Sequence, residues 1–222
     1  MQKIPVVIIG SSGHAKVVID IVEKQGVYEI VALLGEEKNI GKTCMGYAVS
    51  GTEESINSVL LKYPNCKAFI AIGDNFIRQK IAQKIISINP TIEFATVVHP
   101  SAQIAKDVAI GKGVAIMANA VINSGSMISD GCIINTKASV DHDCFVGNYS
   151  AVLPGVTIGG NVQIGERSVL CIGSVVKQGV SIGNDTVVGA GALVLENIGD
   201  TLLVYGSPAK VVKTRTVGEK YL

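Results

Sequence analysis

Aliphatic side chains recur at every sixth position between residues 104 and 194, sixteen times in succession. A period of six is typical of a β-solenoid, in which each hexad forms one short strand and one corner. Three hexads close a triangular coil of eighteen residues, so residues eighteen apart lie directly above one another. The repeat therefore predicts a prism of about five coils, roughly 25 Å long. The aliphatic series is Ile104, Ile110, Ile116, Ile122, Ile128, Ile134, Val140, Val146, Val152, Ile158, Ile164, Leu170, Val176, Ile182, Val188 and Val194.

A second series of mostly small residues follows four positions after the first and keeps the same phase. These side chains are expected to point inward near the corners, where bulky groups would not fit. Glycine often follows the aliphatic residue, at a tight bend that favours a residue without Cβ. Neither a two-residue alternation nor the 3.6-residue period of a helix fits this stretch as well. The second series is Val108, Val114, Ala120, Ser126, Cys132, Ala138, Cys144, Ser150, Val156, Val162, Ser168, Ser174, Val180, Thr186 and Ala192, and only Ile198 breaks the size rule.

The first hundred residues have a different pattern, in which strand-like and helix-like runs alternate. Such alternation predicts a small parallel sheet with right-handed crossovers, hence an α/β domain of Rossmann-like type. Expected strands cover residues 4–9, 30–34, 68–72 and 93–98, and helices cover 53–62, 76–88 and the stretch whose buried face holds Val17, Val18, Ile21 and Val22. The predicted domains are 1–98 (Rossmann-like), 99–205 (all-β parallel solenoid) and 206–222 (a C-terminal tail).

Composition narrows the class of protein. The net charge is +1 and 17% of residues are charged, so neither nucleic acid nor an anionic membrane is the expected partner. The N-terminus lacks the features of a signal peptide, and no apolar run is long enough for a membrane-spanning helix. The five cysteines form no CxxC pair. We therefore expect a cytoplasmic protein with reduced thiols.

The turn Gly10-Ser11-Ser12-Gly13-His14 follows the first strand and opens the first helix. Glycines allow close approach of a ligand, and a helix N-terminus offers free N–H groups to an anion. The turn is not the dinucleotide fingerprint. The end of the expected second strand also lacks the acidic residue that would bind a ribose, although Glu36 follows just after it. A nucleotide or sugar phosphate is the favoured ligand, ahead of NAD and of a turn without a ligand. His14 is expected to contact that ligand, and residues 72–75, with Gly73, to lie near the same crevice.

His142 is the best candidate for proton transfer among the three histidines of the chain. It lies in the solenoid between Asp141 and Asp143, and a neighbouring carboxylate can orient an imidazole and raise its basicity. Gly160 lies eighteen residues further on, so its backbone N–H would lie one coil away as an oxyanion donor. The alternative is an exposed histidine without a function. The sequence shows no serine nucleophile motif and no metal-ligand cluster. A general base, an oxyanion donor and a nucleotide-sized pocket remain, and this combination suits acyl transfer from a thioester.

With these motifs the chain resembles the left-handed β-helix family of sugar O- and N-acyltransferases. Nearest are the N-acetyltransferases of UDP-4-amino sugars in the bacillosamine pathway and the sialic acid O-acetyltransferases. The resemblance covers nearly the whole chain. The motifs that carry it are Gly10–His14, Ala71–Asn75, His99–Ala102, Asn135-Thr136, Asp141–Cys144, Pro154-Gly155 and Gly206–Lys210.

The resemblance implies a left-handed parallel β-helix, a homotrimer with active sites shared between subunits, and acetyl-CoA as co-substrate with no metal. It implies that His142 is the general base, with Asp143 raising its basicity and Gly160 as oxyanion donor. Acetyl-CoA would lie near Ile172 and Ala190. The nucleotide-sugar would be held by Ser12, Gly13, His14 and Gly73.

Two positions depart from the family pattern. Ala151 stands where many relatives carry a further histidine that contacts acetyl-CoA. After the second strand, relatives tend to have two acids, whereas Gly35-Glu36 leaves only Glu36 for uracil or ribose.

The predicted function is acetyl transfer to the 4-amino group of a UDP-linked 4-amino-4,6-dideoxy sugar, for glycan or surface polysaccharide synthesis. The alternatives are O-acetylation of a sialic acid or related sugar, and N-acetylation of a GDP- or dTDP-linked amino sugar. A solenoid scaffold or a carbonic-anhydrase-like metal protein is the competitor from another class.

Overall fold

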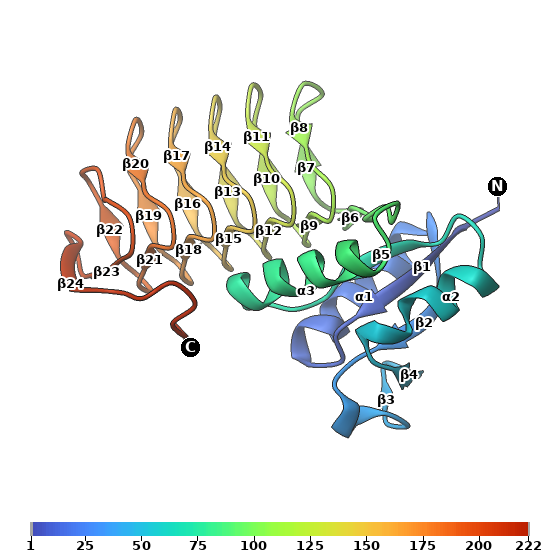
Figure 1. Cartoon of the computed structure of the whole chain (residues 1–222). Coiled ribbons are helices and arrows are strands. Elements are labelled where there is room, and N and C mark those ends of the chain that lie inside the picture. The colour runs from blue at the N-terminus through green and yellow to red at the C-terminus, as the bar shows by residue number, and fades with distance from the viewer. Residues whose placement is uncertain (1, 222) are drawn as a thin grey trace. The chain divides into compact units, whose positions relative to one another are not determined.

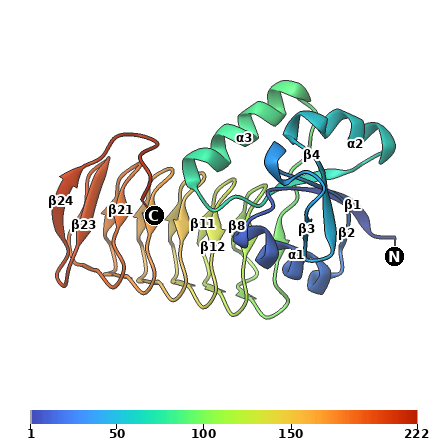
Figure 2. The ribbon, with the colours of Figure 1, turned by 90° about the horizontal axis from the view of Figure 1, so that it is seen from below.

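A computed structural model describes residues 2–221 of the chain. The chain divides into two compact units, Met1–Pro100 and Ser101–Leu222. The first is an α/β domain, and the second is a solenoid of short parallel strands that lie side by side along the prism (Figures 1 and 2). The predicted fold class is confirmed.

A five-stranded sheet forms the centre of the first unit, in the order β3-β4-β2-β1-β5. The pairs among β4, β2, β1 and β5 are parallel, and β3 is antiparallel to β4. Helix α1 lies on one face of this sheet, and α2 and α3 lie on the other (Figure 2). Its strands are β1 (Ile4–Ile9), β2 (Tyr28–Leu34), β3 (Thr43–Cys44), β4 (Tyr47–Gly51) and β5 (Lys67–Ile70), while β6 (Val97–Val98) lies outside this sheet. The helices are α1 (Gly13–Gln25), η1 (Glu37–Asn39), η2 (Glu53–Ser55), α2 (Ile56–Lys62) and α3 (Asn75–Ile88).

Strand β1 lies at the point where the strand order changes direction. The chain passes from β1 to β2 on one side, and later places β5 on the other side of β1. Its crossovers lie on opposite faces, so the carboxyl end of β1 opens a crevice of the kind that binds ligands in α/β sheets. The Gly10–Gly13 turn leaves β1 at this point and starts α1.

Several elements of the first unit differ from the sequence prediction. The β3–β4 hairpin was not predicted, because β3 has only two residues and the buried positions that alternate along β4 are only Val49 and Gly51. The predicted strand at 93–98 is reduced to β6 and a single bridge at Phe94, which pairs with Ala68. Val17 was placed on the buried face of α1 but is 42% exposed, whereas Ile19 is buried in its stead.

Sixteen two-residue strands make the solenoid, and each ends at one residue of the aliphatic series. They are β7 (Gln103–Ile104), β8 (Ala109–Ile110), β9 (Ala115–Ile116), β10 (Val121–Ile122), β11 (Met127–Ile128), β12 (Ile133–Ile134), β13 (Ser139–Val140), β14 (Phe145–Val146), β15 (Ala151–Val152), β16 (Thr157–Ile158), β17 (Gln163–Ile164), β18 (Val169–Leu170), β19 (Val175–Val176), β20 (Ser181–Ile182), β21 (Val187–Val188) and β22 (Leu193–Val194). Every third strand belongs to the same parallel sheet, so three sheets form the walls. Figure 1 shows the coils following one another from green to red.

Coils stack in an eighteen-residue register, in which Ile122 pairs with Val140 and Val140 with Ile158. Residues of the small series lie buried beside this aliphatic column, and their hydroxyls connect the coils. Ser150 donates to the Gly165 carbonyl at 2.6 Å and accepts from the Ser168 N–H at 2.9 Å. These bonds satisfy polar atoms inside an apolar prism, which explains why serine is tolerated there.

A third period-six series appears in the backbone and was not predicted. From residue 113 to residue 191, every sixth residue has a positive φ near 60°, in the left-handed region. Glycine and Asn fill many of these turns, but Lys137 and Tyr149 occupy the same conformation. The left-handed turn therefore does not by itself require glycine.

Glycines directly after the aliphatic residue have another cause than the tight bend that the sequence suggested. Their φ values are not left-handed. A Cβ on Gly165 would lie 2.7 Å from the backbone of Gly183 and Asn184 in the next coil. Close approach of successive coils excludes a side chain at this place.

Beyond β22 the last coil is closed by a hairpin. Strand β23 (Leu202–Tyr205) pairs parallel with β21, and β24 (Lys210–Thr214) pairs antiparallel with β23. The tail predicted from residue 206 thus contains a strand. A hairpin partner occupies the β23 edge that would otherwise continue the stack.

Two further observations concern residues 2–221. The five cysteine thiols are buried and form no disulfide among these residues. No helix in this part of the chain combines the length and apolarity needed to cross a membrane.

We expect Gly165→Ala to destabilise the solenoid by about 1–3 kcal/mol, because the added methyl overlaps the next coil. Gly199→Ala is the matched control, since its Cβ would meet only Leu202 at 3.8 Å. Urea unfolding of both variants measures the difference. Equal stability of the two variants would contradict close approach as the reason for glycine.

Candidate functional site

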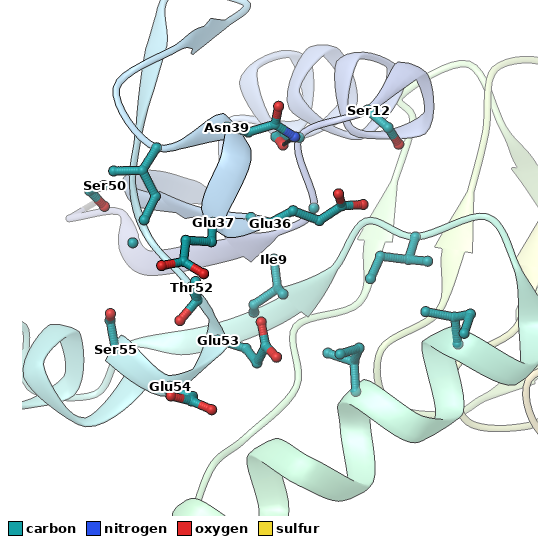
Figure 3. Close-up of a pocket in the computed structure, with 18 residues that line it drawn as sticks. Ile9, Ser12, Glu36, Glu37, Asn39, Ser50, Thr52, Glu53, Glu54 and Ser55 are labelled. Carbon is teal, nitrogen blue, oxygen red and sulfur yellow. Dashed lines mark hydrogen bonds between the residues drawn. The ribbon is translucent and has the colours of Figure 1, made fainter.

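A cavity of about 820 Å³ opens in the first unit at the carboxyl end of β1 (Figure 3). The lining combines the glycine-rich turn, the segment after β2 and the segment after β4, with an apolar side from the start of α3. Its residues are Ile9, Gly10, Ser11, Ser12, Gly35, Glu36, Glu37, Asn39, Ile40, Ser50, Gly51, Thr52, Glu53, Glu54, Ser55, Ile72, Ile77 and Ile81.

The glycine-rich turn brings backbone N–H groups to the cavity. Gly10 has φ 124°, and a Cβ there would meet the Ala71 carbonyl oxygen at 2.5 Å, so only glycine fits between β1 and β5. Ser12 is the N-cap residue of α1, but its side chain does not cap the helix. The first amides of α1 are thus uncapped by that side chain, which suits a phosphate or carboxylate.

Carboxylates dominate the opposite part of the lining. Figure 3 shows Glu36, Glu37, Glu53 and Glu54 around the cavity. Burial would raise the pKa of Glu53, but its hydrogen bond from Lys84, 2.8 Å long, holds the pKa below the ordinary value. Ionised carboxylates accept hydrogen bonds from hydroxyl and N–H groups, which a ribose and a base provide.

The structure brings some predicted substrate-binding residues together and leaves others apart. Ser12 and Glu36 line the cavity, whereas Gly13, His14 and Gly73 do not. Glu37 lines it although sequence reasoning assigned the acidic role to Glu36 alone. The adjacent acid in the sequence was the signal that could have identified it.

His14 is partly buried, near Arg78. Burial, and secondly the charge of Arg78, lowers the pKa of His14 to about 4. Its Nε2 atom is buried and makes no hydrogen bond in the part of the chain that the structure describes. Arg78 itself donates to the carbonyls of Ile72 and Gly73 at 2.9 and 2.8 Å. His14 is therefore neutral near pH 7 and does not line the cavity.

In the solenoid, His142 and its predicted partners lie together. His142 follows β13, and its Nδ1 lies 2.8 Å from Asp143 Oδ2. Asp141 Oδ1 accepts the backbone N–H of His142 at 2.8 Å and a hydrogen bond from Asn123 Nδ2 at 2.9 Å. The imidazole is about half exposed, so a substrate can reach it.

Both neighbouring carboxylates act on the histidine. The hydrogen bond to Asp143, and secondly the charge of Asp141, raises the pKa of His142 above its ordinary value. Asp143 accepts Nδ1–H, which leaves Nε2 as the basic nitrogen of the neutral ring. The hydrogen bond from Asn123 lowers the pKa of Asp141 and keeps it ionised.

Gly160 lies directly against the His142 ring, one coil further on. A Cβ on Gly160 would lie 2.6 Å from Nε2 and 2.7 Å from Cε1 of His142. Asn161 N–H donates to the His142 carbonyl at 2.9 Å, which fixes this register. The Gly160 N–H makes no hydrogen bond within residues 2–221. The geometry therefore provides a base and an uncommitted N–H donor at one place.

Ile172 and Ala190 lie at another corner of the solenoid. Ile172 is in the turn between β18 and β19 and is 59% exposed, and Ala190 is exposed one coil further on. Their register is fixed by the Gly191 N–H, which donates to the Ile172 carbonyl at 2.9 Å. His142 is in the turn between β13 and β14, so a single chain does not bring the two sets together. Ala151, the position that departs from the expected family pattern, is fully buried in β15.

No cluster of three His, Cys, Asp or Glu side chains able to hold a metal ion occurs among residues 2–221.

Known proteins are similar to this chain in sequence and in fold. Residues 5–85 match the family model described as the PglD N-terminal domain. The crystal structure of PerB from Caulobacter crescentus, in complex with CoA and GDP-perosamine, has 38% identity and a TM-score of 0.88, over 94% of this chain and 97% of that one. The chain belongs to the left-handed β-helix family of sugar acyltransferases.

Two further relatives belong to the same family. The acetyltransferase domain of PglB from Neisseria gonorrhoeae FA1090, in complex with acetyl coenzyme A, is 31% identical with a TM-score of 0.86, over 95% of this chain and 100% of that one. The UDP-N-acetylbacillosamine N-acetyltransferase of Bacillus subtilis (strain 168) is 30% identical over 115 residues, 51% of either chain. This chain thus matches about half the length of that curated relative.

We expect His14 to make the stability of this acyltransferase depend on pH. In the unfolded chain an ordinary histidine takes up a proton below about pH 6.5, whereas folded His14 does so only below about pH 4. The unfolded state binds more protons between these values, so stability falls as the pH is lowered through this window, by about 3 kcal/mol from this group.

Urea unfolding of the wild type and of His14→Gln between pH 7 and pH 4 measures this contribution. The variant should lose less stability than the wild type on acidification. Identical pH profiles would show that His14 titrates normally.

We also expect Asp143→Asn to lower the pKa of His142, because the largest cause of its raised value is removed. Three histidines give few imidazole signals, so NMR titration can follow each one. Leu195→Ala, an exposed change elsewhere on the solenoid, is the control and should leave the titration unchanged. An unaltered His142 titration in Asp143→Asn would contradict the assigned pairing.

Proposed function

We propose that this protein is an acetyl-CoA-dependent N-acetyltransferase that acts on the 4-amino group of a nucleotide-linked 4-amino-4,6-dideoxy sugar. The observation that carries the proposal is the contact of His142 with Gly160 one coil away, with Asp143 on the opposite ring nitrogen. This places a proton acceptor beside a backbone donor, as direct attack on a thioester requires.

His142 and Gly160 have separate roles in the proposed reaction. The substrate amine attacks the thioester carbonyl carbon, and His142 Nε2 takes the proton that the amine loses. The carbonyl oxygen becomes an oxyanion and accepts a hydrogen bond from the Gly160 N–H. When the C–S bond breaks, the thiolate of CoA leaves and takes that proton from the imidazolium. Asp143 stabilises the imidazolium and keeps Nδ1 protonated throughout.

The co-substrate assignment is supported by the relatives. PerB was crystallised with CoA, and the PglB acetyltransferase domain with acetyl coenzyme A. Within this chain, Ile172 and Ala190 are the proposed contacts for acetyl-CoA. Both side chains are exposed at one corner, where apolar surface can pack on the pantetheine arm.

The nucleotide-sugar is proposed to bind the first unit. The uncapped N-terminus of α1 at Ser12 suits the diphosphate, and Glu36 and Glu37 suit the ribose and base. Two nucleotides have support. GDP is favoured by the PerB complex with GDP-perosamine at 38% identity, and UDP by the name of the Bacillus subtilis relative.

We further propose that the enzyme is a homotrimer whose active sites are shared between subunits. His142 and Ile172 lie at different corners of one solenoid. A second copy that packs against the first can bring its Ile172 corner to the His142 corner, which completes a site that one chain leaves divided. This is a heterologous contact that closes as a ring.

The experiment is a thiol-release assay with acetyl-CoA and a panel of acceptors, namely UDP-, GDP- and dTDP-linked 4-amino-4,6-dideoxy sugars and a free sialic acid. We expect release with a UDP- or GDP-linked amino sugar, and loss of at least about a hundredfold in kcat for His142→Ala. Acetyl-CoA binding by calorimetry and the sedimentation of the variant should match the wild type.

Three outcomes of this assay would contradict the proposal. Near-normal turnover by His142→Ala would show that His142 is not the general base. Thiol release with the sialic acid alone would show that the acceptor is a hydroxyl and not an amine. Absence of acetyl-CoA binding in the wild type would favour a scaffold.

A further inference from the structure

The carboxylate of Asp143 rests on the turn of the preceding coil. Asp143 has φ 56°, and its N–H donates to the Ser124 carbonyl at 3.0 Å. One carboxylate oxygen, Oδ2, faces His142 Nδ1, while the other, Oδ1, points at Gly125. The side chain is thus held between the ring that it orients and the backbone of the coil below.

Gly125 leaves the space that this carboxylate occupies. A Cβ on Gly125 would overlap Asp143 Oδ1 and approach Cγ to 3.3 Å, closer than nearly all carbon contacts in proteins. A left-handed φ of 74° is not a sufficient reason for glycine here. Asn161 adopts the same conformation in the same column of turns and carries a side chain.

The turn that holds Gly125 is fixed from below. Ser124 Oγ donates to Asp107 Oδ2 at 2.6 Å. On the other side of the turn, Asn123 holds Asp141, the second carboxylate beside His142. The base is therefore positioned by contacts across coils as well as by its own neighbours.

We propose that Gly125 is a positioning residue of the acetyl-transfer site. Because Gly125 has no side chain, the Asp143 carboxylate can lie where it accepts Nδ1–H of His142. Nε2 of His142 is then left free to take the proton of the amine. The effect on catalysis rests on the function proposed above. The effect on the histidine itself does not, since it is a property of the protein without substrate.

The test is Gly125→Ala beside Gly179→Ala. Gly179 occupies the same column with φ 72°, and nothing lies within 4 Å of its added Cβ, so it reports the backbone strain alone. For Gly125→Ala we expect kcat to fall about ten- to hundredfold, with KM for acetyl-CoA changed by less than about twofold. The NMR titration of His142 should move to lower pH, as Asp143 leaves the ring while Asp141 remains. Gly179→Ala should keep the wild-type values.

A double-mutant cycle separates positioning from general damage. If Gly125 acts through the carboxylate, Gly125→Ala has little further effect on kcat or on the His142 titration in an Asp143→Ala background. Should Gly125→Ala fold poorly, Gly125→Asn replaces it, because Asn tolerates this conformation at Asn161.

The outcomes are distinct. An unchanged His142 titration in a folded Gly125 variant overturns the proposal, as does an equal loss in Gly179→Ala or full additivity in the cycle. If the titration shifts but no acceptor is acetylated, Gly125 still positions the histidine and the proposed function fails.

Discussion

Every feature of the solenoid depends on the backbone hydrogen bonds that join one coil to the next in an eighteen-residue register. Two-residue strands are too short to be stable by themselves, and they persist because neighbouring coils pair with them, on both sides except at the ends of the sheets. The same bonds continue through the turns, where Asn161 donates to His142 and Asp143 donates to Ser124. A side chain in one turn is thereby placed against the same position of the next coil, and this contact builds the geometry of the proposed catalytic site.

This register imposes different demands on each position of the hexad. The aliphatic residue fills the prism, a serine near the corner reaches the next coil with its hydroxyl, and a glycine after the aliphatic residue, as at Gly165, leaves room for the backbone of the next coil. Turn positions outside the prism are free of these demands. His142 and Asp143 lie there, so reactive groups can be introduced without a cost in core packing.

The proposed ligand site of the first unit arises in another way. Its cavity exists because strands on both sides of β1 are reached by crossovers on opposite faces of the sheet. The uncapped start of α1 supplies partial positive charge, and the segments after β2 and β4 supply carboxylates. A nucleotide-sugar, with an anionic diphosphate and a base and ribose rich in hydrogen-bonding groups, matches this division.

The sequence by itself determined the solenoid, the stacking of residues eighteen apart and the pairing of His142 with Gly160, because these follow from a local period repeated many times. It also indicated the turn at Gly10–Gly13 as a candidate ligand site, because its glycines and following helix are contiguous. Only the tertiary structure decided which residues line the cavity. Glu37 lines it and His14 does not, since both depend on the approach of segments distant along the chain. The contact of the Asp143 carboxylate with Gly125 likewise could not be predicted from the sequence, because a glycine in a turn is ordinarily explained by its backbone conformation. Contact between coils showed instead that the space above that glycine holds the carboxylate.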